Sequence, residues 1–279
     1  MSWLAVAKKD FSDAIRSRLM LAVAVIFVAF TGGGIALGSA FGIESGAVVV
    51  LILQVLLSGM SIFIPLIAIG IAYQSIAGER ESGSLKLLLS LPNSRLDVVI
   101  GKFLGRLGVL SVAVVIGFVS MLLATAITFE GDIQADVILT FMLAVLLLTI
   151  VFVSIAVSVS AFSDSTFSAA IGGFGLFVVF QFAWGGLVFL ARYVVNGFET
   201  PAFGAQAPEW AQVLFVVNPM TGWQQATAWL LRRVSEDQST QQQAADAFYL
   251  EPWFGFVVLA FWIVVPLVVG YLRFDSVDL

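Results

Sequence analysis

The chain has 279 residues, of which 60% are hydrophobic and only 11% are charged, with a net charge of −5. So few polar residues cannot cover a water-soluble globule of this length, so the composition predicts an integral membrane protein. Neither cysteine nor histidine is present, which excludes disulfides and argues against catalytic triads or zinc sites built by this chain alone.

The first 18 residues do not resemble a secretory signal peptide, because Asp10, Asp13 and four basic residues interrupt any apolar run. Apolar residues instead recur at helical spacing along one face: Trp3, Leu4, Ala7, Phe11, Ala14 and Ile15. Residues 1–18 are therefore predicted to form an interfacial helix whose basic side chains meet anionic headgroups at the cytoplasmic surface. An ordinary basic flank of the first span is the alternative interpretation.

Six apolar segments follow, each long enough to cross a bilayer. The predicted spans are residues 19–43, 45–78, 96–129, 137–163, 165–191 and 252–274. We therefore expect an all-α membrane protein in which residues 1–279 form one transmembrane domain. The second segment is too long for one straight crossing, so a kink near Ser58-Gly59 or Pro65 is expected.

The segment between the second and third spans, residues 79–95, is the most specific part of the sequence. Glu79-Arg80-Glu81 follows a run without charge, so the second span must leave the hydrocarbon there. Gly83 and Ser84 supply turn and N-cap chemistry. A short amphipathic helix is predicted next, and its end is set by Pro92. Leucines form its apolar side, and Lys86 lies on its polar side. These leucines are Leu85, Leu88 and Leu89.

These residues resemble a pattern found in the permease subunits of ABC-2 type ABC transporters. The pattern contains an acidic-Arg-acidic triplet, Gly-Ser/Thr-Leu, a leucine run, proline, a basic residue and Gly-Lys. It stands here as Glu79-Arg80-Glu81, Gly83-Ser84-Leu85, Leu87-Leu88-Leu89, Pro92, Arg95 and Gly101-Lys102. The flanking segments look most like the permeases of nitrous-oxide-reductase maturation systems. The resemblance covers roughly the first 110 residues and rests further on mainly on the number of spans.

In that family the corresponding segment is a coupling helix, here about Ser84–Leu91, that inserts into a separate ATPase subunit. The resemblance implies two ATPase subunits that hold the ATP and Mg, and a second permease copy, most simply a homodimer. It implies no cofactor, metal or catalytic residue in this chain, and no nucleic-acid partner. The predicted ATPase-coupling residues are Glu79, Arg80, Glu81, Gly83, Ser84, Leu85, Lys86, Leu88, Leu89, Pro92 and Arg95. The alternative is that the apolar stripe lies in lipid headgroups.

Basic residues predict the orientation. If the amino terminus is inside, all but Arg192, Arg232 and Arg233 of the thirteen lysines and arginines fall on the inner side. The positive-inside rule then predicts a multi-pass protein of the cell membrane with both termini and residues 79–95 in the cytoplasm.

Residues 192–251 form the predicted external loop between the fifth and sixth spans. Apolar spacing after Pro208 and after Asn218-Pro219 predicts two short amphipathic helices on the outer leaflet. They either contact substrate or only cap the membrane domain. The segment Glu236–Asp246 has no apolar face and is predicted to be mobile. Three glutamines in or near spans, Gln54, Gln74 and Gln181, either line a cavity or hydrogen-bond between helices.

Two ATP-dependent functions remain open at this point, and a third function would not depend on ATP. The resemblance favours an ATP-driven exporter of an unidentified substrate. The alternative is a mechanotransmitter, which uses ATP to act on an extracytoplasmic partner protein without carrying a solute. A channel or scaffold would have no ATPase partner at all. No pair of carboxylates lies within the spans, which disfavours a proton-coupled carrier.

Overall fold

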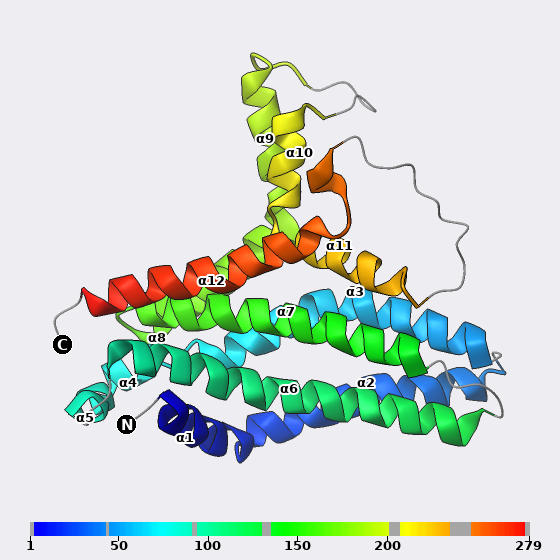
Figure 1. The fold of residues 1–279 in the computed structure, drawn as a ribbon, viewed down its shortest axis with the longest axis horizontal. Coiled ribbons are helices and arrows are strands. Elements are labelled where there is room, and N and C mark those ends of the chain that lie inside the picture. Colours follow the sequence, from blue (N-terminus) through cyan, green and yellow to red (C-terminus); the bar gives the residue numbers. More distant parts are fainter. Residues whose placement is uncertain are drawn as a thin grey trace.

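The computed structural model describes residues 3–42, 45–90, 94–129, 135–200, 207–234 and 247–276. Within these ranges every regular element is a helix (Figure 1): α1 (Trp3–Ile15), α2 (Arg18–Ala40), α3 (Ser45–Ala72), α4 (Ala77–Glu81), α5 (Ser84–Ser90), α6 (Arg95–Thr128), α7 (Ala135–Phe162), α8 (Thr166–Val178), η1 (Val179–Ala183), α9 (Trp184–Val195), α10 (Glu209–Val216), α11 (Pro219–Leu231), η2 (Phe248–Leu250) and α12 (Phe254–Asp275).

Six helical segments are long and apolar enough to cross a membrane, which confirms the prediction of an all-α chain with six spans. These segments are Met20–Ala40, Leu57–Glu81, Arg95–Thr128, Ala135–Phe162, Thr166–Val195 and Phe254–Asp275. The chain is therefore a multi-pass membrane protein.

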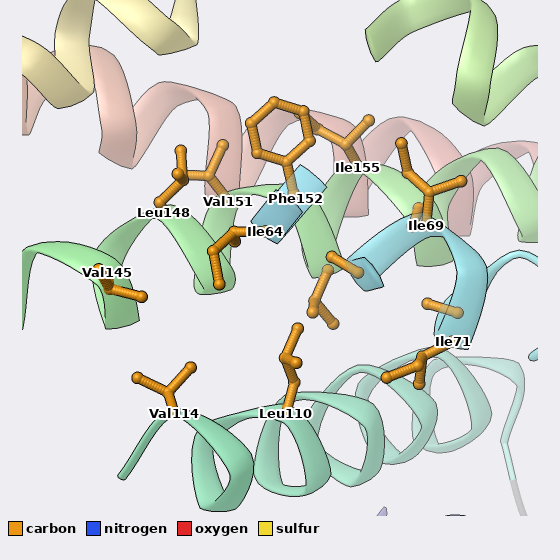
Figure 2. Close-up of a cluster of buried hydrophobic side chains, with 14 of the residues drawn as sticks. Ile64, Ile69, Ile71, Leu110, Val114, Val145, Leu148, Val151, Phe152 and Ile155 are labelled. Carbon is orange, nitrogen blue, oxygen red and sulfur yellow. The ribbon is translucent and has the colours of Figure 1, made fainter. Parts of the chain in front are cut away.

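Helix α7 is the centre of the bundle and packs against α3, α6, α11 and α12. Figure 2 shows its apolar side chains meeting those of α3 and α6: Ile64, Ile69, Ile71, Leu110, Val114, Val145, Leu148, Val151, Phe152 and Ile155. On the side that faces α12, the hydroxyl of Ser154 donates to the carbonyl of Ile263 at 2.6 Å, and that of Ser158 donates to the carbonyl of Pro266. The hydroxyl of Ser154 also lies 3.4 Å from the carbonyl of Trp262, which lacks its helical donor because residue 266 is a proline.

Helices α1 and α2 follow one another along α6 and run parallel to it (Figure 1). Glycines in α6 make this close packing possible. A Cβ atom at Gly101 would lie 2.6 Å from Cβ of Val6, and one at Gly117 would lie 2.9 Å from Cβ of Phe27. The predicted amino-terminal helix is therefore present and packs against α6. The predicted contact of its basic side chains with headgroups stays a prediction, and Lys8, Lys9, Arg16 and Arg18 are exposed.

The second predicted span is not one helix to its end. Helix α3 continues through Pro65 and ends at Ala72, and a turn over residues 73–76 separates it from α4. Ser160 of α7 fixes this turn, because its buried hydroxyl accepts from the backbone N–H groups of Ile76 and Ala77, each at 3.0 Å, and donates to the carbonyl of Tyr73 at 2.6 Å. The direction of α4 is thereby set by α7.

The fifth predicted span bends at η1, a π-helical segment. After this segment α9 and α10 project away from the bundle (Figure 1). The amide of Asn218 donates to the carbonyl of Phe180 within η1 at 2.9 Å, and the indole of Trp184 donates to the carbonyl of Leu214 at 2.9 Å. Helices α10 and α11 stand in the two places where the loop sequence predicts short helices. The segment Glu236–Asp246 lies outside the described residues.

Candidate functional site

Helices α4 and α5 lie at the end of the bundle where α1 begins and α12 ends (Figure 1). Gly83 makes the sharp turn between the two helices, because its φ of +74° is readily adopted only by glycine. The hydroxyls of Ser82 and Ser84 lie 2.9 Å apart beside this turn. The turn predicted at Gly83 is therefore present. The charged triplet before it, Glu79-Arg80-Glu81, belongs to α4.

A buried cluster of four charged side chains anchors α4 to α1 and α6. The ammonium group of Lys102 lies 2.9 Å from Oδ1 of Asp10 and 2.6 Å from Oε1 of Glu79. Arg106 pairs through Nε with Oδ2 of Asp10 at 2.8 Å and donates to the carbonyl of Ile71 at 3.0 Å. The side chains of Asp10 and Lys102 are only 3% and 8% exposed, whereas those of Glu79 and Arg106 are 24% and 21% exposed, so the cluster has a buried centre and a partly exposed edge.

This cluster is electrically balanced, since two carboxylates face one ammonium and one guanidinium. Burial makes each ion expensive to leave alone, so the four groups are stable only together. A cavity of about 420 Å³ adjoins the cluster and is lined in part by Asp13, Gln74 and Arg106. Three separate segments are therefore bound into one unit at this end of the bundle.

Two arginines attach the same end to the last helix. Arg80 of α4 donates to the carbonyl of Ser163 at 2.7 Å and pairs with Asp164 at 3.1 Å. Arg95 at the start of α6 donates to the carbonyl of Asp275 at 2.9 Å. The guanidinium groups of Arg80 and Arg95 lie 5.7 and 5.5 Å from the ring centroid of the fully buried Phe274. The carboxyl end of α12 is thus fixed by residues on both sides of α5.

The third residue of the charged triplet binds the start of α8. The carboxylate of Glu81 accepts from the backbone N–H of Thr166 at 2.9 Å and from its hydroxyl at 2.7 Å. An acidic side chain at a helix amino terminus satisfies a free N–H and opposes the positive end of the helix dipole. All three charged residues of Glu79-Arg80-Glu81 therefore have partners inside this chain.

The leucines of α5 do not share one exposed face. Leu85 is 1% exposed and belongs to the core, and Leu88 and Leu89 are half-buried against that core. Leu87, by contrast, is 72% exposed, and Lys86 beside it is exposed too. The side chains that α5 offers to a partner are therefore chiefly Lys86 and Leu87, while Pro92 lies outside the described residues.

Sequence reasoning missed the partners of the charged triplet. Asp10 interrupts the apolar spacing of Ala7 and Ala14 on the buried face of α1, and a charge at such a position is a signal for a buried ion pair. Lys102 and Arg106 are four residues apart in α6 and so share one face. Among the described residues, no group of three or more acidic side chains could hold a metal ion.

Comparison with known proteins points in one direction. The profile of a family described as "ABC-2 family transporter protein" matches residues 4–279. The chain is 33% identical over 219 residues to a "Probable ABC transporter permease protein NosY" of Stutzerimonas stutzeri, and this alignment covers 77% of this chain and 76% of the relative. It is 32% identical over 219 residues to the protein of the same description in Pseudomonas aeruginosa, covering 77% of each chain.

Proposed function

This chain belongs to the ABC-2 transporter family, and from that premise we propose that it is a permease subunit that receives mechanical work from a separate ATPase through α4 and α5. Two copies of the chain pair with two ATPase subunits, which bind the ATP and Mg. The inner side is the end with α4 and α5, and the assembly exports its substrate to the other side. The resemblance to permeases of nitrous-oxide-reductase maturation systems suggests a role in the maturation of a metalloenzyme outside the cell.

The observation that carries this proposal is the combination of exposed side chains on α5, the tip, with the charged residues of α4, the base, which are bonded to other parts of the bundle. Lys86 and Leu87 are exposed on α5, which suits one charged and one apolar contact with a partner. Behind this tip, Glu79 bonds Lys102 of α6, Arg80 bonds the carbonyl of Ala161 in α7, and Glu81 bonds Thr166 of α8. A push on the tip would therefore move several helices together rather than bend one segment.

The helices that would respond to such a push are those bonded to the base. The buried cluster reaches α1 and α6, Arg80 reaches the turn after α7 and the end of α12, and Glu81 reaches α8. Movement of these helices as packed bodies would shift the chain between inward-open and outward-open arrangements.

One feature favours the alternative of a mechanotransmitter that acts on an extracytoplasmic protein. Helix α10 lies outside the six spans, projects from the bundle beside α9 (Figure 1) and exposes large apolar side chains: Trp210, Val213, Leu214 and Phe215. A protein bound there would be moved through η1 and α8, whose first residue bonds Glu81. An extracytoplasmic protein that copurifies with the chain would support this function.

The test is coupling to the ATPase. We expect the chain to copurify with an ABC ATPase and to stimulate its ATP hydrolysis. The double variant Lys86→Glu/Leu87→Asp should lose most of this stimulation while its membrane insertion and thermal stability stay unchanged. Lys8→Glu is the matched control, because Lys8 is also an exposed lysine and lies on α1 at the same end. Full stimulation by the double variant, or equal loss in the control, would contradict the proposal.

A further inference from the structure

The cavity of about 420 Å³ beside the charged cluster lies where several elements meet. Its walls come from the joined ends of α1 and α2, from α6, and from the turn between α3 and α4. On the α3 side the wall includes Gly70, where a Cβ atom would meet no other atom within 4 Å. The volume lies within the range of small-molecule sites.

The packing of α1 on α6 places this cavity at the edge of the hydrocarbon layer. A Cβ atom at Gly108 of α6 would lie 3.1 Å from the ring of Phe11 in α1. Because α1 and α6 run parallel (Figure 1), Asp13 lies further along α6 than Phe11 does, past Arg106, the last charged residue of α6. Asp13 is therefore at the level of the lipid headgroups.

The lining changes from polar to apolar along the direction of the spans. Asp13, Gln74 and Arg106 supply polar groups. Met20, where the first span begins, and Val109, which follows the charged part of α6, supply apolar surface. A molecule that fills the whole cavity must therefore be amphipathic, with a polar head and an apolar body.

Asp13 is the lining charge that has no counter-charge. The four charges of the cluster balance one another, and Lys102 and Arg106 are both paired with its carboxylates. Asp13 is exposed and makes no hydrogen bond or ion pair in the described part of the chain. An anionic group would therefore meet a lining with excess negative charge, whereas an ammonium group would meet a carboxylate beside a region of low dielectric constant.

The residues after Asp13 supply the opposite charge. Arg16 and Arg18 are exposed on either side of Ser17, which lines the cavity, and Met20 follows. From the surface into the membrane, the chain thus offers a carboxylate, then guanidinium groups, then an apolar side chain. A zwitterionic phospholipid presents the complementary order, which is an ammonium group, a phosphate and an acyl chain.

We propose that this cavity binds the headgroup of a phospholipid that carries a primary ammonium group, such as phosphatidylethanolamine. The lipid belongs to the leaflet on the side of α4 and α5. Its ammonium group donates to Asp13, and its phosphate lies towards Arg18. The inference goes beyond the proposed function, because such a site requires neither ATP nor a transported substrate.

The test measures which lipid the full-length chain retains. The purified chain is reconstituted in vesicles that contain equal amounts of phosphatidylethanolamine, phosphatidylcholine and phosphatidylglycerol, extracted in mild detergent, and analysed by native mass spectrometry. Phosphatidylcholine keeps the positive charge but replaces the N–H donors by methyl groups, and phosphatidylglycerol has no cation.

Two variants remove the site, and each has a matched control. Asp13→Asn removes the charge at nearly constant volume, and its control is Asp275→Asn, an exposed acidic residue of α12 at the same end of the bundle. Gly70→Phe fills the cavity, and its control is Gly33→Phe in α2, where a Cβ atom likewise meets no atom within 4 Å.

We expect the parent to retain phosphatidylethanolamine at least about tenfold over each of the other lipids, as one charge-assisted hydrogen bond allows. Asp13→Asn and Gly70→Phe should lose this preference, and both controls should keep it. If Gly70→Phe does not fold, the parent and Asp13→Asn decide the question.

Equal retention of the three lipids, a preference for phosphatidylglycerol, or an unchanged preference in Asp13→Asn would overturn the inference. So would displacement of the lipid by glycerophosphoethanolamine, a water-soluble headgroup without acyl chains, since the site would then take the polar group alone. The measurement uses no ATPase, so its failure and the failure of the proposed function are distinguishable.

Discussion

Lys102 offers the sharpest test of how the base of α4 is held. Its ammonium group is the only contact that Asp10 and Glu79 share in the described structure, at 2.9 and 2.6 Å. The variant Lys102→Met keeps a side chain of similar length and removes the charge. Two carboxylates are then left with Arg106 as the single cation of the cluster.

The expected loss of stability is large. At an effective dielectric constant of about 20, each of the two contacts is worth about 6 kcal/mol of direct attraction. Desolvation of the ions offsets much of this attraction, and breaking a buried ion pair by removing one partner costs about 3–5 kcal/mol. The reason is that Asp10 keeps only Arg106, while Glu79 is left in its partly buried place without a cation in contact. Adding Glu79→Gln to Lys102→Met restores the charge balance and should recover at least about 1 kcal/mol.

The measurement is the free energy of unfolding of the detergent-purified chain in a denaturant titration, followed through its seven tryptophans. The control is Lys86→Met, which removes the same charge from an exposed position and should stay within about 0.5 kcal/mol of the parent. The reasoning is refuted if Lys102→Met is as stable as the parent. It is also refuted if the losses of Lys102→Met and Glu79→Gln simply add in the double variant.

Three further variants test the packing around the site by the same titration. Gly101→Ala should destabilise by about 1–3 kcal/mol, because the new methyl group would lie 2.6 Å from Val6, whereas Gly70→Ala meets no atom within 4 Å and should be neutral or stabilising; equal effects would contradict this. Ser160→Ala should cost about 1–3 kcal/mol, since two backbone N–H groups and one carbonyl lose their partner, and a neutral result would show that the turn holds without it. Phe274→Ala should cost about 3–5 kcal/mol because the ring is fully buried between Arg80 and Arg95; a loss below about 1 kcal/mol would refute that packing.

The number and places of the membrane helices could be predicted from the sequence. Long uncharged runs have one low-energy solution in lipid, so hydropathy alone found six spans. The breaks inside them were harder to predict. The turn over residues 73–76 is fixed by a serine more than eighty residues away, and the bend at η1 is fixed by Asn218 in the following loop. Such partners are set by tertiary packing, which local sequence does not encode.

The position of the candidate site in the chain could be predicted from the sequence, but the contacts of its side chains could not. Composition and turn chemistry located the segment 79–95, and Gly83 makes the turn that its neighbours predicted. Helical spacing predicted that Leu85 lies on an apolar face that contacts a partner. In the structure Leu85 is buried in the core, and Leu87 is exposed instead. Which leucines of α5 are buried depends on which side of the helix packs against the rest of the bundle. The ion pairs and hydrogen bonds of the charged triplet likewise involve residues elsewhere in the chain, namely Asp10, Lys102 and Thr166.

The clasp around Phe274 has a consequence for biosynthesis. Arg80 and Arg95 emerge from the ribosome long before this aromatic ring, which belongs to α12. Until the final helix has been inserted, Arg95 lacks the carbonyls of Phe274 and Asp275, and both guanidinium groups lack the ring of Phe274. A chain without α12 therefore lacks these contacts at the end of the bundle that holds α4 and α5. The contacts that close this end of the bundle are thus completed only after α12 has been made.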